Sequence, residues 1–173
     1  MARFIPPRWG QLKPLKVKGC AIQVLYSNKV APFFREMDRL SYPNAALHAK
    51  TVDQLSNTPE DILRWNVSTD PSRKSLPRSV LRSALGRRWK QAFHEALRAN
   101  GYTWHGQHRA TLKRGLVGTI ELAVHGGVGL NSSMWNLVGQ CKQVVRAIKT
   151  QQPVESHVWR QHRSGAPPSP RQL

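Results

Sequence analysis

Acidic residues and cysteines are scarce in this chain of 173 residues. Asp and Glu number 9 against 27 Lys and Arg, which gives a formal net charge of +18. Cys20 and Cys141 are the only thiols, too few for a disulfide scaffold or a four-cysteine zinc site. Each has apolar neighbours in the sequence, so we expect two small core residues in a reducing compartment.

Long hydrophobic runs are also missing. No stretch approaches the roughly 20 apolar residues that a membrane span needs, which argues against an integral membrane protein. No hydrophobic secretory signal follows Met1. The first 35 residues lack acids, as mitochondrial targeting segments do, although Pro6 and Pro7 stand early in them and no long amphipathic helix is evident there.

The charge is unevenly distributed along the chain. Six of the nine acids lie between residues 36 and 70, whereas residues 73–114 hold eleven Lys or Arg and one acid, Glu95. A compact body with this charge repels itself, so the sequence predicts a polyanionic partner, with nucleic acid ahead of an anionic membrane surface. The region 36–70 is expected to face protein or solvent.

Three segments are predicted from composition. Residues 1–18 are basic and contain three prolines, and we expect an extended arm that becomes ordered on a partner, or else a disordered tail. Residues 19–150 form a single domain. Residues 151–173 are a basic, proline-rich and irregular tail.

The first half of the domain gives weaker structural signals than the second half. Its expected elements are a strand at 19–27, a helix at 29–41, a strand at 45–52 that completes a βαβ unit, a short helix from Thr58 to Trp65, and a loop at 66–75. In the second half we expect a helix at 76–101, a loop or hairpin at 102–111, a strand at 113–124, a glycine-rich turn at 125–133 and a helix at 134–148. This order predicts an α+β fold, with a small mixed β-sheet packed against two or three helices.

The helix expected at 76–101 has two different faces. Apolar residues recur every three or four positions on one side, where Trp89 and Phe93 are the expected anchors against the 134–148 helix and the 113–124 strand. Six Lys or Arg lie on or beside the other side, and only Glu95 opposes them. A solvated helix face usually mixes charges of both signs, so this pattern favours a binding surface.

The turn at Gly126, Gly127 and Gly129 lies between a strand and a helix N-terminus, where backbone N–H groups can bind a phosphate. It matches neither a Walker A loop nor a dinucleotide fingerprint. A plain tight connection is the leading interpretation, ahead of a nucleic-acid phosphate site.

No motif predicts an enzyme. His105 and His108 could ligate a metal, but no Cys or carboxylate is near them in the sequence. Contacts to nucleotides, or an ordinary surface position, fit these histidines better. No nucleophile has a flanking motif either, so we expect no catalytic residue, no metal, no cofactor and no small-molecule substrate.

The candidate RNA-binding residues combine the basic helix face with both termini and the aromatic loop. Arg outnumbers Lys among them, which suits bidentate contact with phosphate and stacking on bases. They are Arg3, Arg8, Lys13, Lys16, Lys18, Arg78, Arg82, Arg87, Arg88, Lys90, Arg98, Trp104, His105, His108, Arg109, Lys113, Arg114, Arg160 and Arg163.

A small α+β body with a basic, proline-containing arm at one end and a basic, proline-rich tail at the other resembles a ribosomal protein. The Trp and His content and the acid-free first 35 residues make it similar to a mitochondrial ribosomal protein, of a lineage-specific, fungal type. The resemblance implies a structural constituent of the ribosome in the mitochondrial matrix, a ribonucleoprotein active in translation, with rRNA and neighbouring ribosomal proteins as partners. The alternatives are an RNA-processing or RNA-modifying enzyme, or its accessory subunit, and a basic DNA-binding protein.

Overall fold

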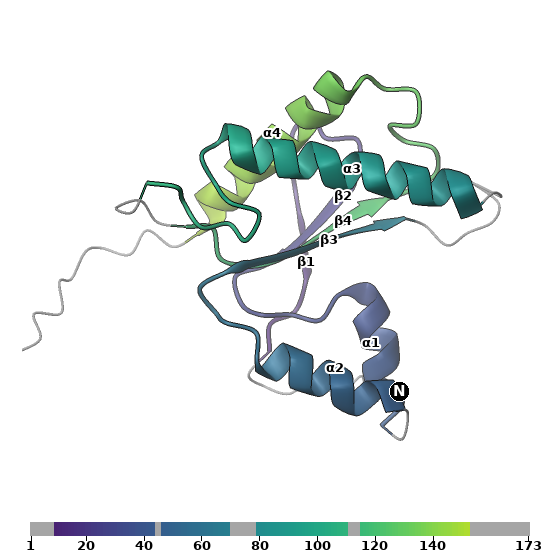
Figure 1. Ribbon diagram of the computed structural model, residues 1–173, viewed down its shortest axis with the longest axis vertical. Helices are drawn as coiled ribbons and strands as arrows, with labels where there is room; N and C mark the ends of the chain where they lie inside the picture. Colours follow the sequence, from purple (N-terminus) through teal and green to yellow (C-terminus); the bar gives the residue numbers. More distant parts are fainter. Residues whose placement is uncertain (1–8, 44–45, 70–78, 111–114, 153–173) are drawn as a thin grey trace, which may run out of the picture.

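The computed structural model describes residues 9–43, 46–69, 79–110 and 115–152, and the expectations for all other residues lie outside this part of the chain. Its elements are β1 (Lys13–Leu15), β2 (Gln23–Ser27), α1 (Phe34–Leu40), α2 (Ala46–Ser56), β3 (Leu63–Thr69), α3 (Ser79–Ala99), β4 (Gly118–Val124) and α4 (Met134–Gln151). They form three layers, with α3 and α4 on one face of a small mixed sheet and α1 and α2 on the other (Figure 1). The predicted α+β class is confirmed.

The sheet is arranged around β4. The strand order is β1-β2-β4-β3, with β1 and β4 antiparallel to β2 and with β3 parallel to β4. A parallel pair needs a crossover connection, and α3 lies in the connection between β3 and β4. The two strands are in register from Leu63 opposite Gly118 to Thr69 opposite Val124.

The main core lies between the sheet and the layer of α3 and α4. Ile120, Leu122 and Val124 alternate along β4 on the face toward these helices and are essentially inaccessible to solvent. Trp89 and Phe93 of α3 are fully buried in the same cluster, which confirms them as anchors. The helix α3 ends where expected, because Gly101 adopts a left-handed conformation with a φ of +83°.

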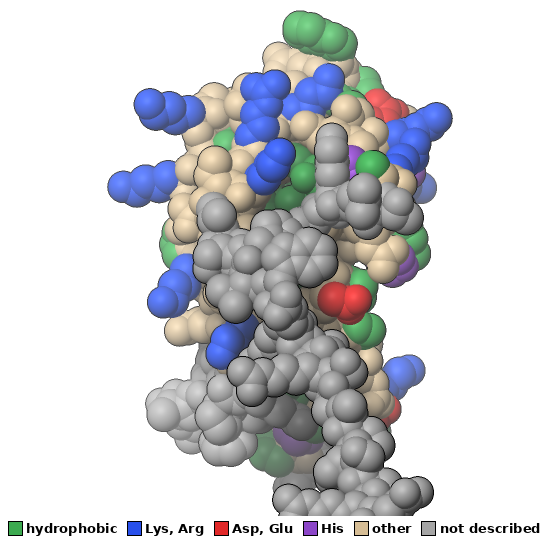
Figure 2. Space-filling view, turned by 90° about the vertical axis from the view of Figure 1, so that its left-hand side faces the viewer, with side chains coloured by type: hydrophobic (Ala, Val, Ile, Leu, Met, Phe, Trp, Pro, Cys, Tyr) green, Lys and Arg blue, Asp and Glu red, His purple; other side chains and the backbone are tan. Residues whose placement is uncertain are grey.

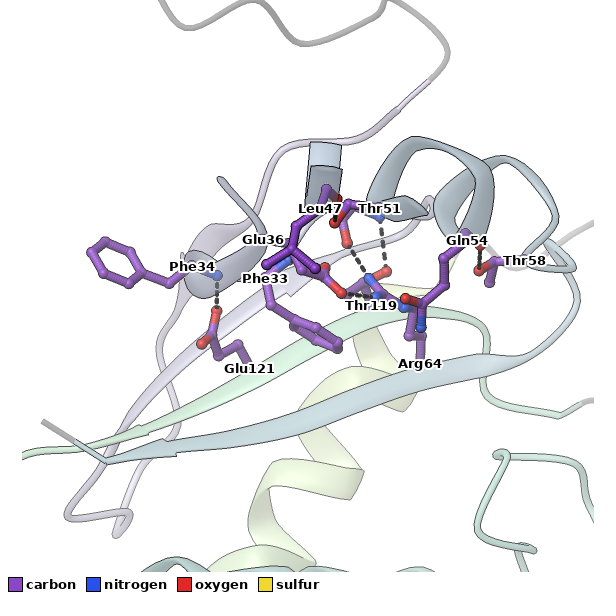
Figure 3. Close-up of polar contacts among 11 residues, drawn as sticks. Phe33, Phe34, Glu36, Leu47, Thr51, Gln54, Thr58, Arg64, Thr119 and Glu121 are labelled. Atoms are coloured by element: carbon purple, nitrogen blue, oxygen red, sulfur yellow. Dashed lines mark hydrogen bonds and ion pairs between the residues drawn. The ribbon is translucent and has the colours of Figure 1, made fainter. Parts of the chain in front are cut away.

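The opposite face of β4 is also buried, and its side chains are polar. Thr119 Oγ1 accepts a hydrogen bond from the Ala31 N–H (2.9 Å) and donates one to the Lys29 carbonyl (3.1 Å). One oxygen of Glu121 accepts from the Phe34 N–H at 2.9 Å (Figure 3). These bonds fix the segment that leads into α1 on the sheet.

An ion pair joins β3 to the same layer. The Arg64 guanidinium donates to Glu36 of α1 and to the Ala31 carbonyl (2.9 Å), and it lies 4.2 Å from the centroid of the Phe33 ring. Beside these contacts, Trp9, Val30 and Leu55 form a second, small apolar cluster. The layer of α1 and α2 is therefore attached by polar contacts together with this smaller apolar cluster.

Two predictions in the first half of the chain are wrong. The strand expected at 45–52 is the helix α2, so residues 19–52 do not form a βαβ unit. Alanine is a poor strand former, and Thr51 and Leu55, four residues apart, share the buried side of this helix. The helix expected from Thr58 to Trp65 is also wrong, because the Thr58 hydroxyl donates to the Gln54 carbonyl just beyond α2 and Leu63 begins a strand.

Other elements differ mainly in their boundaries. The helix expected at 29–41 begins at Phe34, since Pro32 disfavours helical geometry in the residue before it. The two expected strands at 19–27 and 113–124 are shorter, and residues 66–69 of the expected loop at 66–75 belong to β3. The arm expected at 1–18 is wrong for residues 9–18, because Trp9 is buried and β1 pairs with β2.

Gly129 offers a test of how the glycine-rich turn packs on α3. Its φ is +88°, and a Cβ there would lie 2.8 Å from Trp89 Nε1. We expect Gly129→Ala to lower the free energy of unfolding by about 1–3 kcal/mol through backbone strain and overpacking. Urea denaturation measures the loss. Gly127→Ala is the control, because open space surrounds that position, and equal stability losses in the two variants would contradict the packing described.

Candidate nucleic-acid interface

The positive charge gathers in one layer of the fold. The helices α3 and α4 carry Glu95 as their single acid. Their cations are Arg82, Arg87, Arg88, Lys90, Arg98, Lys142, Arg146 and Lys149. Figure 2 shows Lys and Arg side chains spread over the upper part of the molecule, with few Asp or Glu among them.

The opposite layer carries most of the acids. Five of the acids in the described residues belong to α1, α2 and the connection to β3, where Arg35, Arg39 and Lys50 accompany them. They are Glu36, Asp38, Asp53, Glu60 and Asp61. The uneven charge along the sequence thus becomes a difference between the layer of α3 and α4 and the layer of α1 and α2. These layers lie on opposite faces of the sheet (Figure 1).

The predicted binding residues of α3 are not equivalent. Arg87, Lys90 and Arg98 are exposed, and Arg82 is half-buried. Arg88 is half-buried and donates to the carbonyls of Leu130 (2.7 Å) and Ser132. Arg88 therefore fixes the turn before α4, and the three exposed side chains are the better candidates for contact with phosphate.

The aromatic and His residues of the loop at 101–110 form two separate pairs. Trp104 is 57% exposed and its ring centroid lies 4.0 Å from that of His105. His108 instead packs edge-on against the buried Tyr102 ring, and its Nδ1 accepts from the Ala110 N–H at 3.0 Å. The pair His105 and His108 therefore does not converge on one point, while Trp104 can stack on a base.

The glycine-rich turn, another sequence-based candidate, has a structural role. The turn at 126–129 wraps over Trp89, whose Nε1 donates to the Val128 carbonyl at 3.0 Å, as a tight connection would. Within the part of the chain that the structure describes, no three His, Cys, Asp or Glu side chains form a group that could hold a metal.

The N-terminal cations lie against α4, a juxtaposition that the sequence did not predict. Lys13, Lys16 and Lys18 belong to β1 and the segment after it. That segment is fixed on α4 because the Ala21 N–H donates to the Gln140 side chain at 2.9 Å. The predicted site did not include the cations of α4. Their position opposite the apolar stripe of that helix could have identified them from the sequence.

The two thiols meet where this segment crosses α4. Cys141 is fully buried and Cys20 half-buried, and both are free. Burial raises the pKa of each thiol, and the neighbouring Cys20 thiol is a lesser cause of the rise in the pKa of Cys141. Both groups are therefore protonated at neutral pH, which suits packing and opposes a nucleophilic role.

Several predicted binding residues lie outside the described part of the chain. They are Arg3, Arg8, Arg78, Lys113, Arg114, Arg160 and Arg163. No described helix is both long enough and apolar enough to cross a membrane. Comparison with protein-family models, curated proteins and solved structures found no match.

Arg87 and Arg88 provide a matched pair that separates binding from stability. Each change to Gln removes one positive charge. We expect Arg88→Gln to lower the free energy of unfolding by about 1–3 kcal/mol, because two carbonyls lose a charged donor, whereas Arg87→Gln leaves stability nearly unchanged. Thermal unfolding compares the two variants. A larger loss for Arg87→Gln would contradict the contacts of Arg88.

Proposed function

We propose that this protein is a structural RNA-binding component of the mitochondrial ribosome. The observation that carries the proposal is the segregation of charge, with eight Lys or Arg and one acid on α3 and α4 and most acids across the sheet. The phosphates of rRNA compensate the positive charge of the layer of α3 and α4, the positive layer. Binding is mainly electrostatic and depends on the shape of the RNA.

The composition of the positive layer favours a surface that contacts phosphates, as opposed to one that faces only solvent. Glu95, its single acid, already accepts a hydrogen bond from the Gln91 side chain at 3.1 Å. The exposed Arg87 and Arg98 can donate two parallel hydrogen bonds to one phosphate. Trp104, in the loop that follows α3, adds an aromatic surface for an unpaired base.

The other layer suits protein neighbours within such a particle. It contains the exposed acids Asp38, Asp53 and Glu60 together with the exposed apolar side chains of Phe34 and Leu47. Its acids oppose contact with RNA phosphates, whereas basic ribosomal proteins complement them. The placement in the mitochondrion rests on the resemblance of the basic composition and the Trp and His content to those of mitochondrial ribosomal proteins.

The salt dependence of RNA binding tests the positive layer. We expect a triple variant, Arg87→Gln with Lys90→Gln and Arg98→Gln, to reduce the slope of log K against log salt by about 2–3 units, since each phosphate contact contributes roughly 0.9. Fluorescence anisotropy with a structured rRNA hairpin measures this slope.

The control variant changes the same charge on the opposite layer, through Arg35→Gln, Arg39→Gln and Lys50→Gln. Its slope should equal that of the wild type. Equal reductions in both triple variants would mean that only net charge matters and would contradict the proposal. Tighter binding to duplex DNA than to the hairpin would favour a DNA-binding protein instead.

A further inference from the structure

We infer that the groove between β1 and the C-terminal half of α4 binds one single-stranded segment of RNA through its phosphates. The inference rests on the proposed function and adds a specific site and a specific form of the ligand to it. Two cavities define the groove, one of about 740 Å³ and one of about 190 Å³, and Lys16 lines both of them.

The walls of the groove have the chemistry of a phosphate site. Four cations line the two cavities, namely Lys13, Lys16, Lys18 and Arg146, and no Asp or Glu of the described residues does so. Most of the remaining polar lining is amide and hydroxyl groups, which can donate to phosphate oxygens and ribose hydroxyls. These groups belong to Gln11, Asn28, Gln143, Thr150 and Gln151.

The backbone of both walls is attached to the fold by pairing, packing and hydrogen bonding. On one side, β1 pairs with β2, and Val17 packs against the main core. On the other side, Gln140 of α4 accepts the hydrogen bond from Ala21, and Ile148 is fully buried. A preformed backbone loses little conformational entropy on binding, so cations carried on these walls bind a phosphate chain more tightly than cations on an unfolded segment.

The shape of the groove favours one strand over a duplex. Its larger cavity is within the size range of small-ligand pockets, about 300–1,000 Å³, so it can admit a few nucleotides of one strand. A duplex presents its phosphates on a broad convex surface, which suits the open face of α3. The two surfaces thus divide RNA recognition between them.

Recognition in the groove is of the backbone and not of the bases. The aromatic side chain in its lining is Tyr26, which is 8% exposed and whose hydroxyl donates to the Val117 carbonyl at 3.0 Å. Single-strand binding that depends on base stacking needs exposed rings, which the described lining lacks. Affinity should therefore vary little with the sequence of the strand.

Charge also argues against the C-terminal segment of this chain as the occupant. The residues after Gln152 carry Arg160, Arg163 and Arg171 against the single acid Glu155. Like charges repel, so a cationic groove disfavours this segment and favours a polyanion.

Two double variants with equal loss of charge test the inference. Lys16→Gln with Arg146→Gln changes the groove, and Arg87→Gln with Lys90→Gln changes the face of α3; all four side chains are exposed, so folding should be retained. The probes are a labelled, unstructured oligouridylate of about ten nucleotides and a labelled RNA hairpin, and fluorescence anisotropy measures the binding of each.

We expect the groove variant to bind oligouridylate roughly tenfold more weakly and to reduce the salt slope by about 1.4 units, since each contact with a single strand contributes roughly 0.7. Hairpin binding should change little. The α3 variant should show the opposite pattern. Equal effects of the two variants on both probes would overturn the inference but leave RNA binding intact, whereas no binding of either probe by the wild type would contradict the proposed function itself.

Lysine acetylation gives a readout that needs no variant. Oligouridylate should protect Lys16 and Lys18 of the wild-type protein from acetylation and leave Lys50, on the opposite layer, reactive. Unprotected Lys16 and Lys18 at saturating oligouridylate would overturn the inference, as would displacement of oligouridylate by polyglutamate at equal charge concentration.

Discussion

Burial of both faces of β4 is the constraint on which the rest of this structure depends. Ile120 and Leu122 bury one face beneath Trp89 and Phe93, which places α3 and α4. Thr119 and Glu121 bury the other face, and their hydrogen bonds to backbone N–H groups place the segment before α1. The second face holds its layer through these hydrogen bonds and a small apolar cluster, and the first face holds its layer through apolar burial.

This constraint also separates the charges of the protein. The chain crosses from one side of the sheet to the other after β3, and the acids lie mainly before that crossing and the cations mainly after it. The protein therefore has two sides with different chemistry. One side is cationic and suited to RNA, and the other carries charges of both signs and is suited to protein. The groove between β1 and α4 extends the cationic side to the N-terminal lysines.

Sequence patterns predicted the second half of the fold well because its periodicities are strong. The apolar stripes of α3 and α4 and the alternation along β4 all correspond to observed elements. In the first half, the prediction was wrong where a local helix signal competed with an alternating pattern typical of a strand. Thr58 and Pro59 indicated a helix start, yet Leu63, Trp65 and Val67 alternate with Arg64 and Asn66 as strand residues do.

The candidate site was predictable in its charge and not in its geometry. The excess of cations on α3 was evident from the sequence. The hydrogen bonds from Arg88 to two loop carbonyls were not, because they join residues more than 40 positions apart. The association of Lys16 with Arg146 is of still longer range. It depends on the packing of the segment before β2 against α4, which no periodicity encodes.

Sedimentation of a mitochondrial lysate in a sucrose gradient tests whether the protein is a component of the ribosome. We expect the protein to migrate with a ribosomal subunit in high salt and to be released by ribonuclease treatment. A free pool near its own mass of 19.6 kDa, unaffected by ribonuclease, would contradict a role as a structural component of the ribosome.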